Sequence, residues 1–301
     1  MFKNILVPLD GSEYAEAALP FSISLAEKLG SRLTLLHVIE KSPPKTIHGE
    51  RHLAQYGEAV KYFENLKEKY FPPGIKVSYH IHDGDDMTVD KAIAIHHNEI
   101  SADLILMTTH GWGGIKEIFF GNIAQQILNT CTVPILFIPP SFKIKTGDIW
   151  PRNILLPLDG TSAHEKGEEA AVYLACTGGS DLFLAYVIPT LNTLPAGQTA
   201  VGVLLPGVTR ELLEMEESGA EDYIECKKKE YSEKGLLNVK TGIYRGDPAM
   251  IISELTEKEN IDLIALGTHG RVGLTAFWSG SVGARVTGRA RRAAILFVPV
   301  G

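Results

Sequence analysis

The sequence predicts an α/β fold made of two tandem, doubly wound domains, each with a parallel sheet covered by helices. Three observations lead to this class. The 301-residue chain repeats itself, short apolar runs alternate with longer helical patterns, and a hydrophobic content of 45% is enough for sizeable cores. At about 150 residues per domain, this length favours two domains.

An internal duplication organises the chain. Two pairs of matching segments show it: KNILVPLDGS at 3–12 with RNILLPLDGT at 152–161, and ADLILMTTHG at 102–111 with IDLIALGTHG at 261–270. Matching landmarks are 149 to 162 residues apart, so insertions are small. The Pro-rich and polar stretch PPSFKIKTGDIW separates the copies. We therefore predict domains at 1–145 and 150–301.

The elements of the first copy follow a regular order. Five short apolar runs are expected to be strands: 4–9, 32–39, 76–82, 103–107 and 134–139. Helical patterns such as 13–30 alternate with them, and the second copy repeats the scheme. Strands alternating with helices form βαβ units and a parallel sheet. Right-handed crossovers then leave the loops that follow the strands along one edge, where ligands bind.

A glycine-rich stretch follows the fourth strand of the second copy. Gly267, Gly270 and Gly280 are spaced as G-x2-G-x9-G, and Ser281 comes next. Glycines let a ligand touch the main chain, and a helix that starts near Gly280 offers free N–H groups to phosphate. His269, Arg271 and the Ser281 hydroxyl would add donors. The alternative is a glycine-rich turn needed only for tight packing.

This pattern resembles the universal stress protein family in its tandem form. The resemblance rests on G-x2-G-x9-G-[ST], on a first strand that ends in P-x-D-x-[ST], and on a second that ends near H-V. It covers nearly the whole chain. It implies five-stranded domains of strand order 3-2-1-4-5, and ATP or AMP bound across the ends of strands 1 and 4.

The resemblance also implies which residues of the second copy bind the nucleotide. Those expected near adenine and ribose are Pro157, Asp159 and Val187. Those expected around ribose and phosphates are Gly267, His269, Gly270, Arg271, Gly280, Ser281 and Val282. Asp159 could help hold Mg²⁺. Its alternative role is to close an Asx-turn or cap the following helix.

The first copy departs from the pattern. Pro8, Asp10, Val38, Gly111 and Gly121 are in place. However, Thr108 replaces the first glycine, Trp112 the arginine and Asn122 the serine. Losing the arginine removes the clearest anion partner, and Lys116 would replace it only in part. We expect tight binding in the second copy, whereas AMP binding or a degenerate scaffold role is left open for the first.

Composition restricts the remaining possibilities. A net charge of −7 argues against nucleic-acid binding. No apolar run is long enough to span a membrane, and the N-terminus lacks a signal-peptide layout. Three widely spaced cysteines fit a reducing compartment, so we expect a cytoplasmic protein.

Histidines gather in the first half of the chain. The pairs His48/His52 and His80/His82 have spacings that place two imidazoles on one face, and His96 and His97 are adjacent. No cysteine or carboxylate completes a tetrahedral set by local spacing, so no metal site is predicted.

The leading functional hypothesis is an adenine-nucleotide-binding stress or regulatory protein with unknown protein partners. The alternatives are a slow ATPase or phosphotransfer protein, and an interaction scaffold without nucleotide. No P-loop lysine and no evident base are present, so no catalytic residue is assigned; His269 and Asp159 are the only candidates. We also expect the two copies to form an intramolecular pseudo-dimer, with a further homodimer left open.

Overall fold

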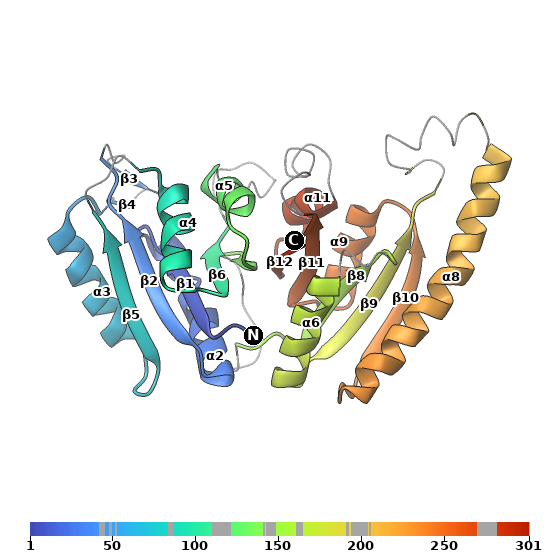
Figure 1. Ribbon diagram of the computed structural model, residues 1–301, viewed down its shortest axis with the longest axis horizontal. Coiled ribbons are helices and arrows are strands. Elements are labelled where there is room, and N and C mark those ends of the chain that lie inside the picture. The colour runs from blue at the N-terminus through green and yellow to red at the C-terminus, as the bar shows by residue number, and fades with distance from the viewer. Residues whose placement is uncertain are drawn as a thin grey trace. The chain divides into compact units, whose positions relative to one another are not determined.

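A computed structural model describes most of the chain. The described residues are 1–41, 46–47, 50–51, 53–83, 87–109, 122–140, 142, 149–160, 165–190, 193, 204, 206–269 and 282–300. They form two compact units (Figure 1). The first unit comprises Met1–Trp150 with Ala294–Phe297, and the second comprises Pro151–Ala293 with Val298–Gly301.

The elements of the first unit alternate between strand and helix. They are β1 (Asn4–Pro8), α1 (Glu13–Glu16), α2 (Leu19–Leu29), β2 (Arg32–Val38), β3 (Thr46–Ile47), β4 (Glu50–Arg51), α3 (Tyr56–Tyr70), β5 (Lys76–His82), α4 (Val89–Glu99), β6 (Leu104–Thr108), α5 (Asn122–Thr130) and β7 (Ile135–Ile138). Those that follow in the second copy are β8 (Asn153–Leu158), α6 (Glu165–Gly178), β9 (Asp181–Ile188), α8 (Pro206–Glu233), β10 (Val239–Arg245), α9 (Pro248–Lys258), β11 (Leu263–His269), α11 (Val282–Arg289) and β12 (Ala294–Val300). The residues of β12 are divided between the two units.

The strand order confirms the predicted fold class. In the first unit the order is β5-β2-β1-β6-β7, and in the second it is β10-β9-β8-β11-β12. Both correspond to 3-2-1-4-5, and the recorded pairs between these strands are parallel. One antiparallel pairing joins Ile295–Phe297 of β12 to β7 within the first unit. The small sheet β3-β4 was not expected from the sequence.

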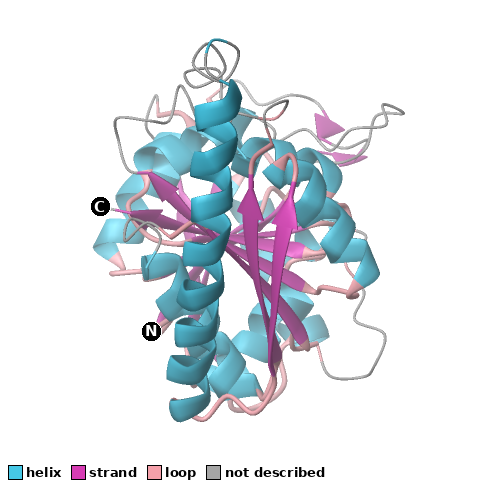
Figure 2. Cartoon of the chain, turned by 90° about the vertical axis from the view of Figure 1, so that its right-hand side faces the viewer, coloured by secondary structure: helices cyan, strands magenta, loops and turns pink. Residues whose placement is uncertain are grey.

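Burial explains why the central strands read as continuous apolar runs. All five residues of β6 are buried, and six of the seven residues of β2 are. Strands covered on both faces need apolar side chains in both directions. The edge strand β5 alternates instead between exposed and half-buried positions over most of its length. The long helix α8 packs against β9 and β10 (Figure 2). Among the described residues, no helix is long and apolar enough to cross a bilayer.

An aspartate anchors the first strand of each copy. The Asp103 carboxylate accepts hydrogen bonds from the backbone N–H groups of Lys3 and Asn4, at 2.8 and 2.9 Å. In the second copy, Asp262 accepts from Arg152 and Asn153, at 2.8 and 3.1 Å. These contacts join the amino end of β1 to that of β6, and the amino end of β8 to that of β11. They explain why the segments K/R-N and A/I-D-L-I occur in both copies.

A buried glutamate joins the first two long helices of the second unit. Glu168 of α6 is only 4% exposed. Its carboxylate accepts from Lys227 Nζ at 2.5 Å, Tyr231 Oη at 2.6 Å and Tyr223 Oη at 3.2 Å, all on α8. Burial and the adjacent Glu168 carboxylate raise the pKa of Tyr231 well above its usual range, which keeps the hydroxyl a donor. In the first unit Glu16 accepts from Tyr70 and Lys69.

Candidate functional site

The candidate site lies where the strand order reverses in the second unit. Strand β8 has β9 on one side and β11 on the other. Its pairing with β11 joins Ile154 to Leu263 and Leu155 to Ile264, and both strands then run on to their carboxyl ends. The loop after β8 begins at Asp159, and β11 carries Gly267 near its end. The topology therefore brings these two positions to one edge, as expected for a ligand site in this fold.

Two further predicted residues reach the same edge. Pro157 is paired with Ala185 of β9, and Leu158 with Tyr186. Val187 follows directly and is 9% exposed. Pro157, Asp159, Val187 and Gly267 thus lie at or just beyond the carboxyl ends of three neighbouring strands. Their contacts with a nucleotide stay predictions.

The loop after β8 is held by a tyrosine that the sequence did not single out. Tyr186 Oη donates to the Asp159 carbonyl at 3.1 Å. Gly160 has φ +73°, a left-handed conformation that side chains rarely adopt, and a Cβ there would lie 3.0 Å from Tyr186 Oη. The Asp159 residue itself is exposed. Tyr186 therefore fixes the backbone that presents the Asp159 carboxylate.

The equivalent aspartate of the first copy has a local role. Asp10 Oδ1 accepts from the backbone N–H of Ser12 at 3.0 Å and from its hydroxyl at 2.6 Å. Ser12 in turn caps α1 by accepting from the Ala15 N–H. This is the Asx-turn that sequence reasoning set beside a ligand role for Asp159. The corresponding segment 161–164 lies outside the described residues, so both roles of Asp159 stay predictions.

Gly267 has a packing partner that sequence reasoning missed. A Cβ on Gly167 of α6 would lie 2.9 Å from Gly267 N and 3.3 Å from its Cα. Helix α6 therefore approaches the backbone of β11 closely, and the glycine at 167 is what permits it. Gly267 is half-buried, whereas the equivalent Thr108 is 7% exposed. Gly267 thus has a structural role in addition to the predicted contact with ligand.

This close approach predicts opposite results for two helical glycines. Gly167→Ala is expected to lower the free energy of unfolding by about 1–3 kcal/mol, because the added methyl meets unyielding backbone. Gly219→Ala in α8 is expected to raise it by about 0.5–1 kcal/mol, because a Cβ there meets no atom within 4 Å and alanine favours helix. Urea denaturation measures both, and equal effects of the two changes would contradict the proposed contact.

Most of the remaining predicted site residues lie outside the part of the chain that the structure describes. Gly270, Arg271, Gly280 and Ser281 lie outside the described residues. His269 ends β11, and its side chain is likewise outside them. Val282 begins α11, two positions after Gly280, which agrees with a helix starting near that glycine. In the first copy, Gly111, Trp112, Lys116 and Gly121 also fall outside the described residues.

A segment of the first unit covers the position equivalent to the candidate site. Leu53 lies so close to Gly11 that a Cβ at position 11 would be 2.6 Å from its Cδ1. The buried His37 of β2 has Nδ1 2.8 Å from the Leu9 carbonyl and Nε2 3.0 Å from the Leu53 carbonyl. Leu53 thus lies over the ends of β1 and β2.

Two tandem α/β domains with strand order 3-2-1-4-5 define the structural class of the protein. The family model described as the universal stress protein family matches residues 1–139 and again 151–295. The chain belongs to the universal stress protein family, in a tandem arrangement.

Similar proteins support this assignment. The universal stress protein E homolog of Haemophilus influenzae is 25% identical over 312 residues, covering 95% of this chain and 94% of its own length. A putative universal stress protein structure from Pseudomonas aeruginosa covers 99% of this chain and 93% of its own, at 17% identity and a TM-score of 0.68. One from Archaeoglobus fulgidus covers 99% and 96%, at 18% identity and 0.64. The structures show the shared fold.

Proposed function

We propose that the second domain, 150–301, binds an adenine nucleotide, ATP or AMP, and that the bound state serves a stress-response or regulatory role. The observation that carries the proposal is that Asp159 and Gly267 follow neighbouring strands at the switch point of the sheet, where Gly267 begins the intact glycine pattern that leads to α11. A helix N-terminus with free N–H groups suits phosphate. The first copy, with Leu53 over the equivalent edge, is proposed not to bind tightly.

The proposed roles of the individual residues are those that the family resemblance implies. Pro157 and Val187 would border the adenine, with Val187 offering main-chain groups. Gly270 and Gly280 would let the phosphates approach the backbone, while Arg271 would add charge-assisted donors. His269, Ser281 and Val282 would complete the ribose and phosphate surroundings. Asp159 would hold the ribose or a Mg²⁺ shared with phosphate oxygens.

A solved universal stress protein is in complex with cAMP. Its TM-score to this chain is 0.35, at 17% identity, so that complex carries no part of the proposal. Cytoplasmic location, the pseudo-dimer and a homodimer stay predictions.

Mass spectrometry of small molecules released from freshly purified protein tests the binding proposal. We expect one adenine nucleotide per chain, because only the second copy keeps the full pattern. Absence of nucleotide, together with no calorimetric response to added ATP or AMP, would favour the scaffold alternative.

Turnover is expected to be absent or very slow. The sequence has no P-loop lysine and no evident base. We expect ATP hydrolysis below about 1 s⁻¹, the low end of ordinary enzyme rates. A steady-state phosphate-release assay measures it. A faster rate that is lost in His269→Ala would instead support the ATPase alternative and make His269 catalytic.

A further inference from the structure

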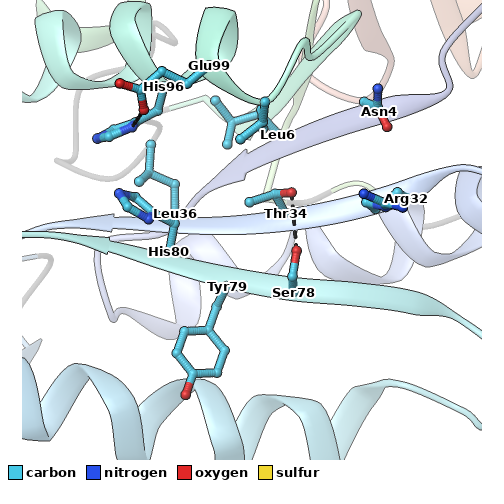
Figure 3. A pocket seen from close by; sticks show the side chains of 11 residues that line it. Asn4, Leu6, Arg32, Thr34, Leu36, Ser78, Tyr79, His80, His96 and Glu99 are labelled. Atoms are coloured by element: carbon cyan, nitrogen blue, oxygen red, sulfur yellow. Dashed lines mark hydrogen bonds and ion pairs between the residues drawn. The ribbon is translucent and has the colours of Figure 1, made fainter.

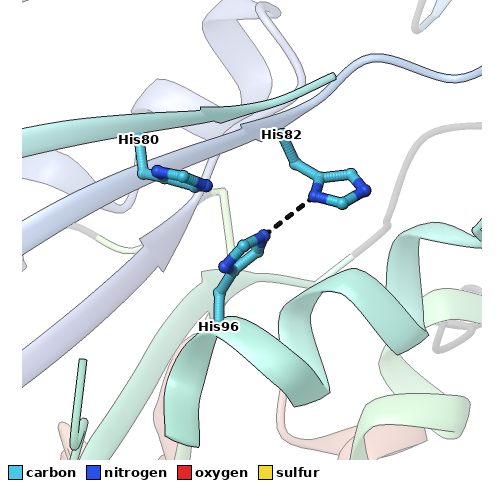
Figure 4. Close-up of side chains that lie close together, drawn as sticks. All are labelled: His80, His82 and His96. Atoms are coloured by element: carbon cyan, nitrogen blue, oxygen red, sulfur yellow. Dashed lines mark hydrogen bonds between the residues drawn. The ribbon is translucent and has the colours of Figure 1, made fainter. Parts of the chain in front are cut away.

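Three imidazoles meet on one face of the first unit's sheet. His80 and His82 are two residues apart on β5, so they point to the same side. Tyr79 points to the other side and stacks on Phe63 of α3, with ring centroids 5.0 Å apart. His96 comes from α4, which covers the histidine face (Figure 4). One ring nitrogen from each of the three lies within 4.8 Å of the others.

Hydrogen bonds orient two of these rings. His96 Nδ1 is 2.6 Å from Glu99 Oε2, and since a carboxylate only accepts, His96 Nδ1–H donates. His96 Nε2 then carries a lone pair in a neutral ring. It lies 2.9 Å from His82 Nδ1, which donates to it. A series of hydrogen bonds from Glu99 through His96 to His82 therefore determines which nitrogen of each of these two rings carries a proton and which carries a lone pair.

This series of hydrogen bonds leaves one buried nitrogen without a partner among the described residues. His82 Nε2 is buried and has no hydrogen-bond partner among the residues that the structure describes. A neutral His82 that donates through Nδ1 has its lone pair on Nε2. An unsatisfied buried polar atom is unfavourable and unusual in a native protein. The atom that faces the other rings is Nδ1 (Figure 4), so an ion shared by the three histidines would replace the proton on Nδ1, and Nε2 would carry the remaining N–H of the neutral ring.

We propose that His80, His82 and His96 bind a divalent transition-metal ion, with Zn²⁺ as the best match. Imidazole nitrogens are preferred ligands of zinc, whereas Ca²⁺ and Mg²⁺ require oxygen. Glu99 is a positioning residue: a carboxylate on the remote ring nitrogen of a ligating histidine fixes its tautomer and raises its basicity. Three protein ligands leave a fourth position for water or an exogenous ligand.

The distances require little rearrangement. Tetrahedral zinc with bonds of about 2.0–2.1 Å places its nitrogen ligands about 3.4 Å apart. The His82–His96 pair at 2.9 Å would open slightly, and the wider separations, up to 4.8 Å, would close through side-chain rotation.

A pocket gives an ion access to the cluster. It has a volume of about 440 Å³, and His80, His96 and Glu99 line one part of it (Figure 3). The rest of the lining comes from Ile100, directly after α4, and from β1, β2 and β5, including Thr34 and Ser78. His80 is exposed while His96 is 8% exposed, so the cluster extends from solvent into the protein.

The second copy has no counterpart of the cluster. By strand register, His82 corresponds to Tyr244 and His80 to Gly242. Tyr244 Oη lies where it would be 2.5 Å from a Cβ at Gly242, so the tyrosine fills this space. The matching helix positions carry Leu255 and Lys258 in place of His96 and Glu99. The proposed metal site is therefore a property of the first copy and is independent of the proposed nucleotide site.

Zinc titration of the chelator-treated full-length protein tests the proposal. We expect one Zn²⁺ per chain in competition with a chromophoric chelator, and a Co²⁺ spectrum of a four-coordinate nitrogen site. Glu99→Gln is expected to weaken Zn²⁺ binding about 10–100-fold. His80→Gln, His82→Gln and His96→Gln are each expected to weaken it more than Glu99→Gln does. Thermal melting in chelator checks that each variant folds.

The control is the double variant His48→Gln/His52→Gln, which removes the other histidine pair of suitable local spacing and should leave zinc affinity unchanged. His80 is exposed, so His80→Gln keeps the test valid even if His96→Gln fails to fold. The proposal is overturned if the parent shows no zinc binding. It is equally overturned if His80→Gln binds like the parent, or if the control variant loses the metal instead.

Discussion

Calorimetric titration of Arg271→Ala with ATP and Mg²⁺ is expected to show a loss of affinity of about tenfold or more. A hydrogen bond to a charged group contributes about 1.5–3 kcal/mol, and 1.4 kcal/mol is a factor of ten. Ser281→Asn, which installs the residue of the first copy, is expected to weaken binding by removing the hydroxyl ligand, while helix capping is kept because asparagine caps about as well as serine. The parent should show a single tight site.

The matched control restores the missing residues in the first copy. Trp112→Arg with Asn122→Ser recreates the charged and hydroxyl groups there. We still expect no second tight site, because Thr108 stays in place and Leu53 lies over Gly11 at the ends of β1 and β2. Two equal sites in the parent protein, or binding lost in Trp112→Ala but kept in Arg271→Ala, would show that the competent copy is the first one.

Gly267→Val is a less direct test than Arg271→Ala of whether a nucleotide contacts the backbone at this position. Gly267 lies against Gly167 of α6, so a bulky side chain at 267 risks disturbing helix packing as well as ligand contact. Its effect on binding is interpretable only beside a melting curve of the same variant. Arg271 and Ser281 were chosen for this reason.

Glu168→Ala is expected to lower the free energy of unfolding by about 3–5 kcal/mol. Removing one partner of a buried ion pair leaves an uncompensated charge, which costs that much. The Lys227 side chain is 16% exposed and that of Glu168 is 5% exposed. The variant also deprives the hydroxyls of Tyr223 and Tyr231 of their acceptor. Urea denaturation at neutral pH measures the change, which is a large part of a typical domain stability.

Two further variants separate charge from packing. In Glu168→Ala/Lys227→Met no buried charge is left, so most of the loss should be recovered, as when buried pairs are replaced by apolar residues. In Glu16→Ala of the first copy the effect should be smaller, because the Lys69 side chain is 59% exposed and stays hydrated. A loss below about 1 kcal/mol for Glu168→Ala, or no recovery in the double variant, would show that this ion pair does not secure α6 to α8.

The sequence by itself determined the duplication, the fold class and the edge of the sheet that carries the candidate site. Each of these properties follows from residues that are close together in the sequence. Strands buried on both faces require continuous apolar runs, and the glycines after β11 are readable one residue at a time. Repetition of the landmarks at nearly constant spacing then showed that the pattern occurs twice. Strand order came from the family resemblance, since alternation alone leaves several orders possible.

Tertiary structure decided which distant residues meet. His80 and His82 were readable as a pair because the strand period is two, but His96 joins them only because α4 packs on β2, the strand beside β5. Glu168 meets Lys227 and Tyr231 across two helices, and Leu53 reaches Gly11 from a different segment. From the sequence, Gly267 was predicted to leave room for a ligand. The structure shows that α6 also approaches the Gly267 backbone closely, at Gly167. Local periodicity fixes the face on which a side chain lies, and only the packing of one element on another fixes what it faces.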